Sequence, residues 1–126
     1  NKYYKIMSII SVEGIRVFSY HGHLPEEAVL GGHFIVNVWV TLDTAEVEKT
    51  DNLNDTLDYV KIIEIVKEQM AVRAEMIEVP AKRIVDRILP LNKVQRVKVE
   101  VEKIKPPIDT SFDKISITTV GENQTK

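Results

Sequence analysis

The 126-residue sequence contains no cysteine. This absence excludes disulfide bonds, thiol nucleophiles and cysteine-based zinc sites, and it agrees with the reducing cytoplasm, which is the location that we expect. An excess of one charge is also lacking. The formal net charge is -2, so nothing in the charge balance points to nucleic acid or to an anionic membrane as a partner. The N-terminal segment "NKYYKIMSII" contains no apolar run long enough for a signal peptide or a membrane span.

The composition is that of a globular protein. Hydrophobic residues make up 44% of the sequence and charged residues 29%, which are ordinary values for a folded domain. We therefore expect one domain over residues 1–126, with a structured core over about residues 6–120.

Four segments are rich in β-branched residues or alternate between apolar and polar residues, as β-strands do. We predict strands over about residues 6–20, 33–43, 94–103 and 114–120. Gly14 interrupts the first strand, which indicates a bulge or a close backbone approach. The chain between the first two strands, residues 21–32, is predicted to be a loop.

The predicted strand over residues 33–43 has one apolar face and one mixed face. Ile35 and Trp39 lie on the mixed face and are too apolar for simple exposure to water. A small sheet with such a second face is typical of a subunit that buries it against another subunit, so we expect an oligomer.

Two further segments carry apolar residues at helical spacing. One predicted helix begins near Tyr59, with Thr56 or Asp58 as its N-cap. The other runs over about residues 77–89 and begins only a residue or two before Pro80, where a missing amide donor costs little. The resulting order is β-β-α-α-β-β. It predicts an α+β fold, in which an antiparallel sheet carries both helices on one face.

Four polar residues stand at the ends of predicted elements, where functional sites are usually built: Glu27, Tyr59, Glu78 and Lys103. Taken singly, each has an ordinary interpretation, as a solvated acid, a core-edge aromatic, a helix-terminal charge and a strand-edge lysine. Lys103 lies just before Pro106 and Pro107, which end the strand because neither can donate a backbone hydrogen bond.

Together these residues fall in four strings, "YHGHLPEE", "TDNLNDTLDY", "EMIEVPAKRI" and "EKIKPPI". In this order and spacing, the strings closely resemble dihydroneopterin aldolase of the folate pathway, over about residues 14–120. The resemblance implies the tunnelling fold, in which four subunits join their sheets into a barrel and two rings stack as an octamer. It also implies an active site between subunits and a retro-aldol cleavage of 7,8-dihydroneopterin, often accompanied by C2′ epimerisation.

The resemblance implies a role in substrate binding for Glu27 and Glu78 and for two apolar residues, Ile77 and Leu57. Glu78 would anchor the pterin ring, while Ile77 and residues 54–57, including Leu57, would line the pocket. Glu27, from the neighbouring subunit, would hold the diol of the substrate, although the adjacent Glu26 is an alternative. The family commonly has His and Leu after the anchoring acid, whereas Val79 and Pro80 follow Glu78 here.

The resemblance implies a catalytic role for Lys103 and Tyr59, in a reaction that uses neither a metal nor an organic cofactor. Lys103 would be the acid–base residue, and Tyr59 would contact the side-chain hydroxyls and help to move the proton. A free lysine has a pKa near ~10.4, so we expect burial or a nearby cation to lower it, and Lys105 is a candidate for that cation.

Three alternatives remain at this point. His21, His23 and His33 could hold zinc, as in the pyruvoyl-tetrahydropterin synthases of the same fold, although the cysteine base of those enzymes is missing. A dihydroneopterin triphosphate epimerase would need basic groups for the phosphates, for which the candidates are Arg16, Lys105 and Lys114. The third alternative is a non-catalytic pterin-binding subunit.

Overall fold

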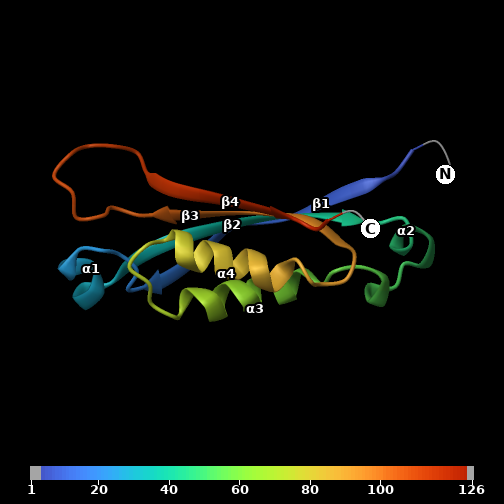
Figure 1. Ribbon diagram of the computed structural model, residues 1–126, viewed down its shortest axis with the longest axis horizontal. Helices are drawn as coiled ribbons and strands as arrows, with labels where there is room; N and C mark the ends of the chain where they lie inside the picture. The colour runs from blue at the N-terminus through green and yellow to red at the C-terminus, as the bar shows by residue number, and fades with distance from the viewer. Residues whose placement is uncertain (1–3, 125–126) are drawn as a thin grey trace.

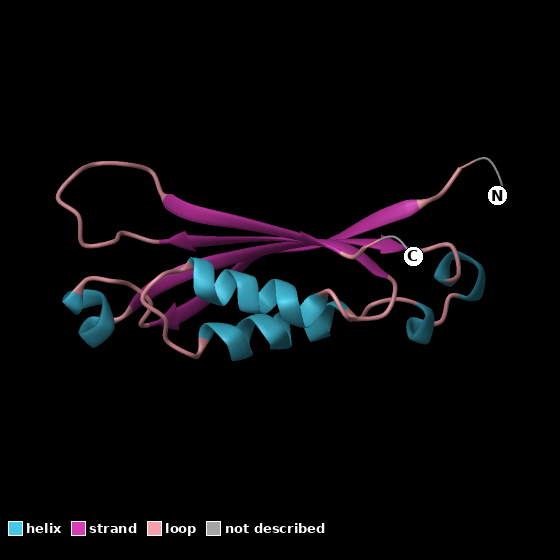
Figure 2. Ribbon diagram, in the orientation of Figure 1, coloured by secondary structure: helices cyan, strands magenta, loops and turns pink. Residues whose placement is uncertain are grey.

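Four antiparallel strands form a single sheet in the order β1-β2-β3-β4 (Figures 1 and 2). The computed structural model describes residues 4–124. The strands span β1 Met7–Ser19, β2 Gly32–Asp43, β3 Val94–Lys103 and β4 Ile115–Glu122. All four predicted strands are therefore confirmed, and their ends differ from the predicted ones by no more than two residues.

Two long helices cover one face of this sheet (Figure 1). They are α3, Tyr59–Met70, which packs against β1, and α4, Glu78–Ile88, which packs against β3 and β4. The predicted β-β-α-α-β-β order and the α+β class are confirmed. The prediction of a loop over residues 21–32 is wrong in part, because the chain forms the short helix α1 (Pro25–Leu30) there. A second short helix, α2 (Val47–Thr50), and the 3-10 turn η1 (Leu53–Asp55) lie between β2 and α3.

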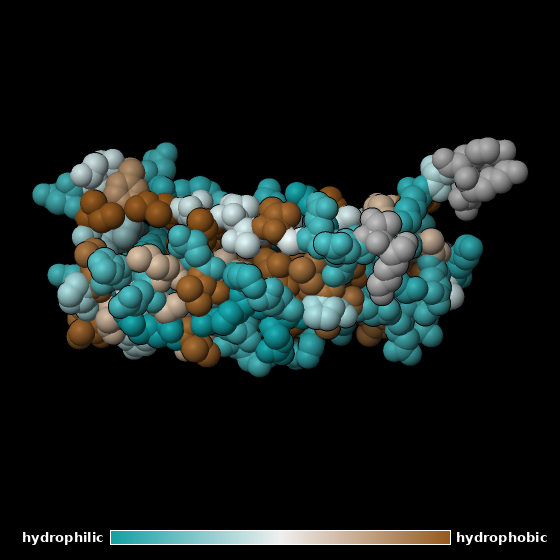
Figure 3. Space-filling view, in the orientation of Figure 1, coloured by the Kyte–Doolittle hydropathy of each residue, from teal (hydrophilic) through white to brown (hydrophobic). Residues whose placement is uncertain are grey.

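The core lies between the sheet and the two long helices. It is built from alternate residues of the central strands and from the apolar stripes of the helices, including Val36, Val38, Val40, Val97, Val99, Val101, Ile62, Ile65, Ile84 and Ile88. The outward surfaces of both helices are mostly hydrophilic (Figure 3). The two periodicities that predicted these elements therefore also determine which of their faces is buried.

Local sequence signals act as predicted. Gly14 has a φ of 75° where the pairing of β1 with β2 shifts register, so it forms the expected bulge. Asp58 is the N-cap of α3, and its Oδ1 accepts a hydrogen bond from the Val60 amide at 3.0 Å. Pro80 is the third residue of α4, within the first turn.

The second face of the sheet carries both apolar and charged residues. Ile35 and Trp39 are half-buried there, and the Lys98 ammonium lies 4.8 Å from the centroid of the Trp39 ring. Asn37 on β2 donates hydrogen bonds to the carboxylates of Glu100 and Glu102 on β3. Over residues 4–124, no helix combines the length and the apolar character that a membrane crossing requires.

After β1 the chain turns through residues 20–24, and this turn is fixed by a buried histidine. His21 is 1% exposed, and its Nδ1 accepts a hydrogen bond from the Ala74 amide at 3.0 Å. Burial lowers the pKa of His21 below its usual 6.5, and the positive charges of Arg83 and Arg73 lower it further. An Nδ1 that accepts a hydrogen bond also carries no proton. The folded protein therefore holds His21 as a neutral imidazole.

This arrangement predicts a loss of stability in weak acid. Below about pH 6.5 the unfolded chain binds a proton at His21 that the folded chain does not, so the free energy of unfolding should fall as the pH is lowered. His21→Asn keeps a hydrogen-bond acceptor but cannot titrate. Urea unfolding between about pH 8 and 5 should show the advantage of wild type over the variant shrinking in acid. A pH-independent difference would contradict a neutral, buried His21.

Candidate functional site

The site lies at one end of the sheet, where β1 ends, β2 begins and β3 ends. This end is on the left side of Figure 1. Ser19 at the end of β1 pairs with Gly32, and Phe34 pairs with Lys103 at the end of β3. The β1–β2 connection, with α1 in it, therefore lies beside the last residue of β3. Because Lys103 pairs directly with Phe34, a core residue, its side chain starts on the helix-covered face of the sheet.

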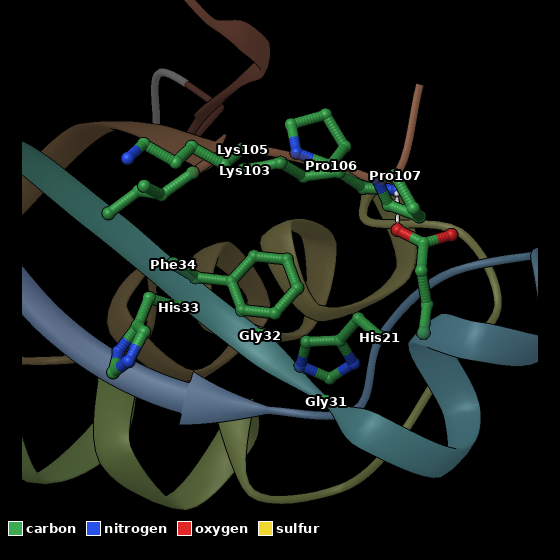
Figure 4. Close-up of a pocket in the computed structure, with 11 residues that line it drawn as sticks. His21, Gly31, Gly32, His33, Phe34, Lys103, Lys105, Pro106 and Pro107 are labelled. Atoms are coloured by element: carbon green, nitrogen blue, oxygen red, sulfur yellow. Dashed lines mark hydrogen bonds and ion pairs between the residues drawn. The ribbon is translucent and has the colours of Figure 1, made fainter. Parts of the chain in front are cut away.

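Lys103 and Glu27 form an ion pair at this end of the sheet. The Lys103 Nζ donates a hydrogen bond to the Glu27 Oε2 at 3.1 Å, the dashed line of Figure 4. Both side chains are largely buried, with 19% of Lys103 and 11% of Glu27 exposed. Glu26 is exposed, so of the two adjacent acids it is Glu27 that faces Lys103. The expectation that Glu27 comes from a neighbouring subunit does not hold for this contact, because both residues belong to one chain.

Helix α1 and a glycine place the Glu27 carboxylate. Pro25 begins the helix and two acids fill its first turn, where the helix dipole favours negative charge. The Leu24 amide donates to Glu27 Oε1 at 3.1 Å. Gly22 has a φ of 144°, and a Cβ there would overlap the Glu27 carboxylate. Sequence reasoning missed α1 and Gly22, although proline followed by two acids is a helix-start signal.

The strand end directs Lys103 and Lys105 in opposite directions (Figure 4). Lys105 has a φ of 48°, which breaks the alternation that would otherwise put both lysines on one face. Lys105, the candidate for a cation near Lys103, therefore points away from it, and the charged partner of Lys103 is the Glu27 carboxylate. A cavity of about 40 Å³, lined by Glu27, Lys103, Pro106 and Pro107 among others, adjoins the pair.

Glu78 stands on the other side of Lys103. It is the first residue of α4 and is exposed, while the preceding Ile77 is buried. Ile77, Glu78 and Lys103 line one open hollow of about 270 Å³, together with His23 and Ile115. The structure thus brings four of the six predicted site residues to one end of the molecule, with Lys103 bordering both the cavity beside Glu27 and the hollow beside Glu78.

The other two predicted residues lie away from this end of the sheet, where α3 begins (Figure 1). The C-terminal end of α3 adjoins the site, because the Met70 carbonyl accepts a hydrogen bond from Ser19 Oγ at 2.7 Å. Tyr59 begins the same helix, about 16 Å away along its axis at 1.5 Å per residue (Figure 1). Tyr59 is 60% exposed, and Leu57 just before the helix is buried. One chain alone therefore does not unite all six.

Two of the residues that the alternatives would use, His33 and Lys114, pack against or pair with other side chains. Within residues 4–124, no three His, Asp or Glu side chains lie close enough to hold a metal ion, and the His33 ring packs edge-on against Phe18. Lys114 is paired with Glu102 at 3.1 Å and with Glu100 at 3.4 Å, and hydrogen bonds to these carboxylates raise its pKa. Lys114 is therefore already neutralised by acids rather than free for a phosphate.

Comparisons with known proteins agree with the resemblance in the sequence. Residues 10–120 match the model of the FolB family, dihydroneopterin aldolase. A probable dihydroneopterin aldolase of Synechocystis sp. is 38% identical over 103 residues, covering 81% of this chain and 87% of that protein. The dihydroneopterin aldolase of Staphylococcus epidermidis is 33% identical over 117 residues, covering 91% of this chain and 97% of that protein.

The fold has a counterpart among solved structures. The crystal structure of the dihydroneopterin aldolase of E. coli, in complex with neopterin, superimposes with a TM-score of 0.80 at 18% sequence identity. The match covers 90% of this chain and 98% of that one. At this level of identity the likeness concerns the α+β fold alone.

Proposed function

The chain belongs to the dihydroneopterin aldolase family of lyases, and on that basis we propose that it cleaves 7,8-dihydroneopterin into 6-hydroxymethyl-7,8-dihydropterin and glycolaldehyde. The observation that carries this proposal is the Glu27–Lys103 pair, which lies at the edge of the hollow that Glu78 lines. The neopterin complex of the E. coli relative supports a pterin as the ligand. A role in folate biosynthesis in the cytoplasm completes the proposal.

Glu78 is proposed to hold the pterin ring. A pterin presents adjacent N–H groups on its guanidine-like edge, and one carboxylate can accept hydrogen bonds from both. Hydrogen bonds to a charged group are worth about 1.5–3 kcal/mol each, which is enough to fix the orientation of the ring. Glu78 lies in the first turn of α4, at the positive end of the helix dipole. Buried Ile77 holds the start of this helix against the core.

Lys103 is proposed to carry the proton transfers. Removal of the proton from the 2′-hydroxyl lets the C1′–C2′ bond break, so that the departing carbon becomes the aldehyde. The bonding electrons enter the ring through its conjugated C=N bond, and C1′ then receives a proton. Because the ring itself accepts the electrons, no imine with Lys103 is needed, and general acid–base catalysis of about 10²–10⁴-fold is the main chemical contribution.

Glu27 is proposed to orient both the lysine and the substrate. One oxygen of its carboxylate accepts from Leu24 and the other from Lys103, and each oxygen keeps a second lone pair. These lone pairs can accept the hydroxyl groups of the substrate side chain. Neither a metal ion nor an organic cofactor is part of this scheme.

We propose that a neighbouring copy completes each site with Tyr59 and Leu57. Tyr59 begins α3 and Leu57 precedes it, about 16 Å along the helix axis from the end that adjoins the site of the same chain, so in this proposal they serve the site of another subunit. Within residues 4–124, β1 and β4 are edge strands with one hydrogen-bonded neighbour each. Pairing of such edges between copies closes a barrel, as in the tunnelling fold, and would cover the half-buried Ile35 and Trp39. A tetrameric or octameric assembly is therefore proposed.

The activity itself can be tested by product analysis. Purified protein incubated with 7,8-dihydroneopterin should release glycolaldehyde and the hydroxymethyl pterin in equal amounts, because one bond is broken per turnover. EDTA should leave the rate unchanged, since no step uses a metal. A rate that EDTA abolishes and zinc restores would refute the metal-free mechanism, and pterin binding without turnover would refute the aldolase assignment.

The division of roles predicts two different kinetic phenotypes. Lys103→Ala should lower kcat by at least about 10²-fold, because proton transfer is lost, while the Kd for neopterin stays within a few-fold. Glu78→Ala should raise that Kd by at least about 10-fold, because the ring loses charge-assisted hydrogen bonds. Stopped-flow turnover and calorimetric binding separate the two effects. Equal effects of both substitutions on binding would contradict the assigned roles.

Sharing of the site between copies predicts complementation. Co-assembled Lys103→Ala and Tyr59→Phe chains should recover up to about one quarter of wild-type activity, because random mixing joins two intact half-sites at that frequency. The matched control combines Lys103→Ala with Glu78→Ala, two changes at the same end of the chain. No mixture of these chains contains an intact site, so its activity should not recover. Recovery in the control but not in the first mixture would overturn the shared site.

A further inference from the structure

We propose that Arg73, in the connection between α3 and α4, is a positioning residue that sets the Glu27–Lys103 pair relative to Glu78. The inference rests on the proposed function. Arg73 touches neither residue of the pair. It acts on the backbone of residues 20–22, the stretch that leads from β1 towards α1.

The guanidinium of Arg73 holds two carbonyl groups of this stretch. Its Nε donates to the Tyr20 carbonyl at 3.0 Å, and its Nη2 donates to the Gly22 carbonyl at 2.9 Å. The two donors belong to one rigid plane, so together they fix the orientation of the turn as well as its distance. A lysine ammonium can reach one such carbonyl but cannot reproduce the fork.

Ala74, the residue after Arg73, also forms hydrogen bonds to the turn over residues 20–22. The Gly22 amide donates to the Ala74 carbonyl at 3.0 Å, and the Ala74 amide donates to His21 Nδ1 at 3.0 Å. Gly22 is thus held on both sides of its α-carbon, by Arg73 at its carbonyl and by Ala74 at its amide. Such a two-sided attachment leaves the backbone of Gly22 little freedom to shift.

The position of Gly22 determines the position of the catalytic pair. The Glu27 carboxylate occupies the space that a side chain at Gly22 would need, so the two are in direct contact. Glu27 in turn holds Lys103 Nζ at 3.1 Å. A displacement at Gly22 therefore reaches the proton-transfer group through one intervening residue. A misplacement of about 1 Å in such a group can lower the rate by about 10²-fold.

The same connection leads directly into the pterin anchor. The hollow that Lys103 borders is also lined by the four residues that follow Ala74, namely Glu75, Met76, Ile77 and Glu78. Glu78 itself is held independently, because α4 begins there with Ile77 and Pro80 buried in the core. Loss of the Arg73 contacts should therefore move the Glu27 side of the site while the ring anchor stays in place.

The test compares Arg73→Lys with Arg83→Lys. Arg83 offers a matched control, since its Nη2 donates to the carbonyls of Gln69 and Val72 in the same region, whereas that of Arg73 donates to the Gly22 carbonyl. Both arginines act on His21 through their charge, and a lysine keeps that charge at either position. Arg73→Lys should lower kcat for 7,8-dihydroneopterin by about 10- to 100-fold, with the Kd for neopterin within a few-fold of wild type. Arg83→Lys should keep kcat within a few-fold of wild type, even if its thermal stability falls as much as that of Arg73→Lys.

Chemical rescue separates positioning from folding. In Arg73→Ala, N-ethylguanidine should restore part of kcat, because a guanidinium can reoccupy an exposed site, whereas ethylammonium should not. Unchanged kcat in Arg73→Lys, an equal loss in Arg83→Lys, or the absence of guanidinium-specific rescue would each overturn the inference. Failure of the proposed function is distinct, because then the wild-type protein would not release glycolaldehyde.

Discussion

A charged pair withdrawn from water, Glu27 with Lys103, is the constraint on which the site depends. Removing a carboxylate and an ammonium from water costs several kcal/mol each, and their mutual attraction offsets that cost only if the geometry is well fixed. The fold meets this demand with rigid elements: the register of β2 with β3 places the lysine, and a six-residue helix places the acid. The pair is then available for proton transfer without further reorganisation.

The arrangement of the main elements follows from the sequence because periodicity carries it. Two-residue alternation along β2 and β3, and the apolar stripes of α3 and α4, each select one buried face, and only one layered architecture buries all of them. Helix α1 escaped prediction because six residues are too few to display a helical period. Its formation depends on the proline at its start and on the contacts of Glu27.

The chemistry of the site followed from resemblance, whereas its geometry required the structure. The choice between Glu26 and Glu27 depends on the phase of α1, and the direction of Lys105 depends on a positive φ that no local pattern announces. The separation of Tyr59 from Lys103 follows from the direction in which α3 runs. Arg73 escaped notice because it works through backbone carbonyls, which leave no sequence motif.

Helix α3 sets the distance between Tyr59, at its first residue, and the end of the sheet that carries Lys103. Its exposed face can change in composition freely, since those side chains touch neither end. Its length cannot: one inserted residue would rotate Tyr59 by about 100° and shift it by about 1.5 Å relative to the sheet. Among descendants of this sequence, substitutions should therefore accumulate along α3, while insertions and deletions should be confined to the connections on either side.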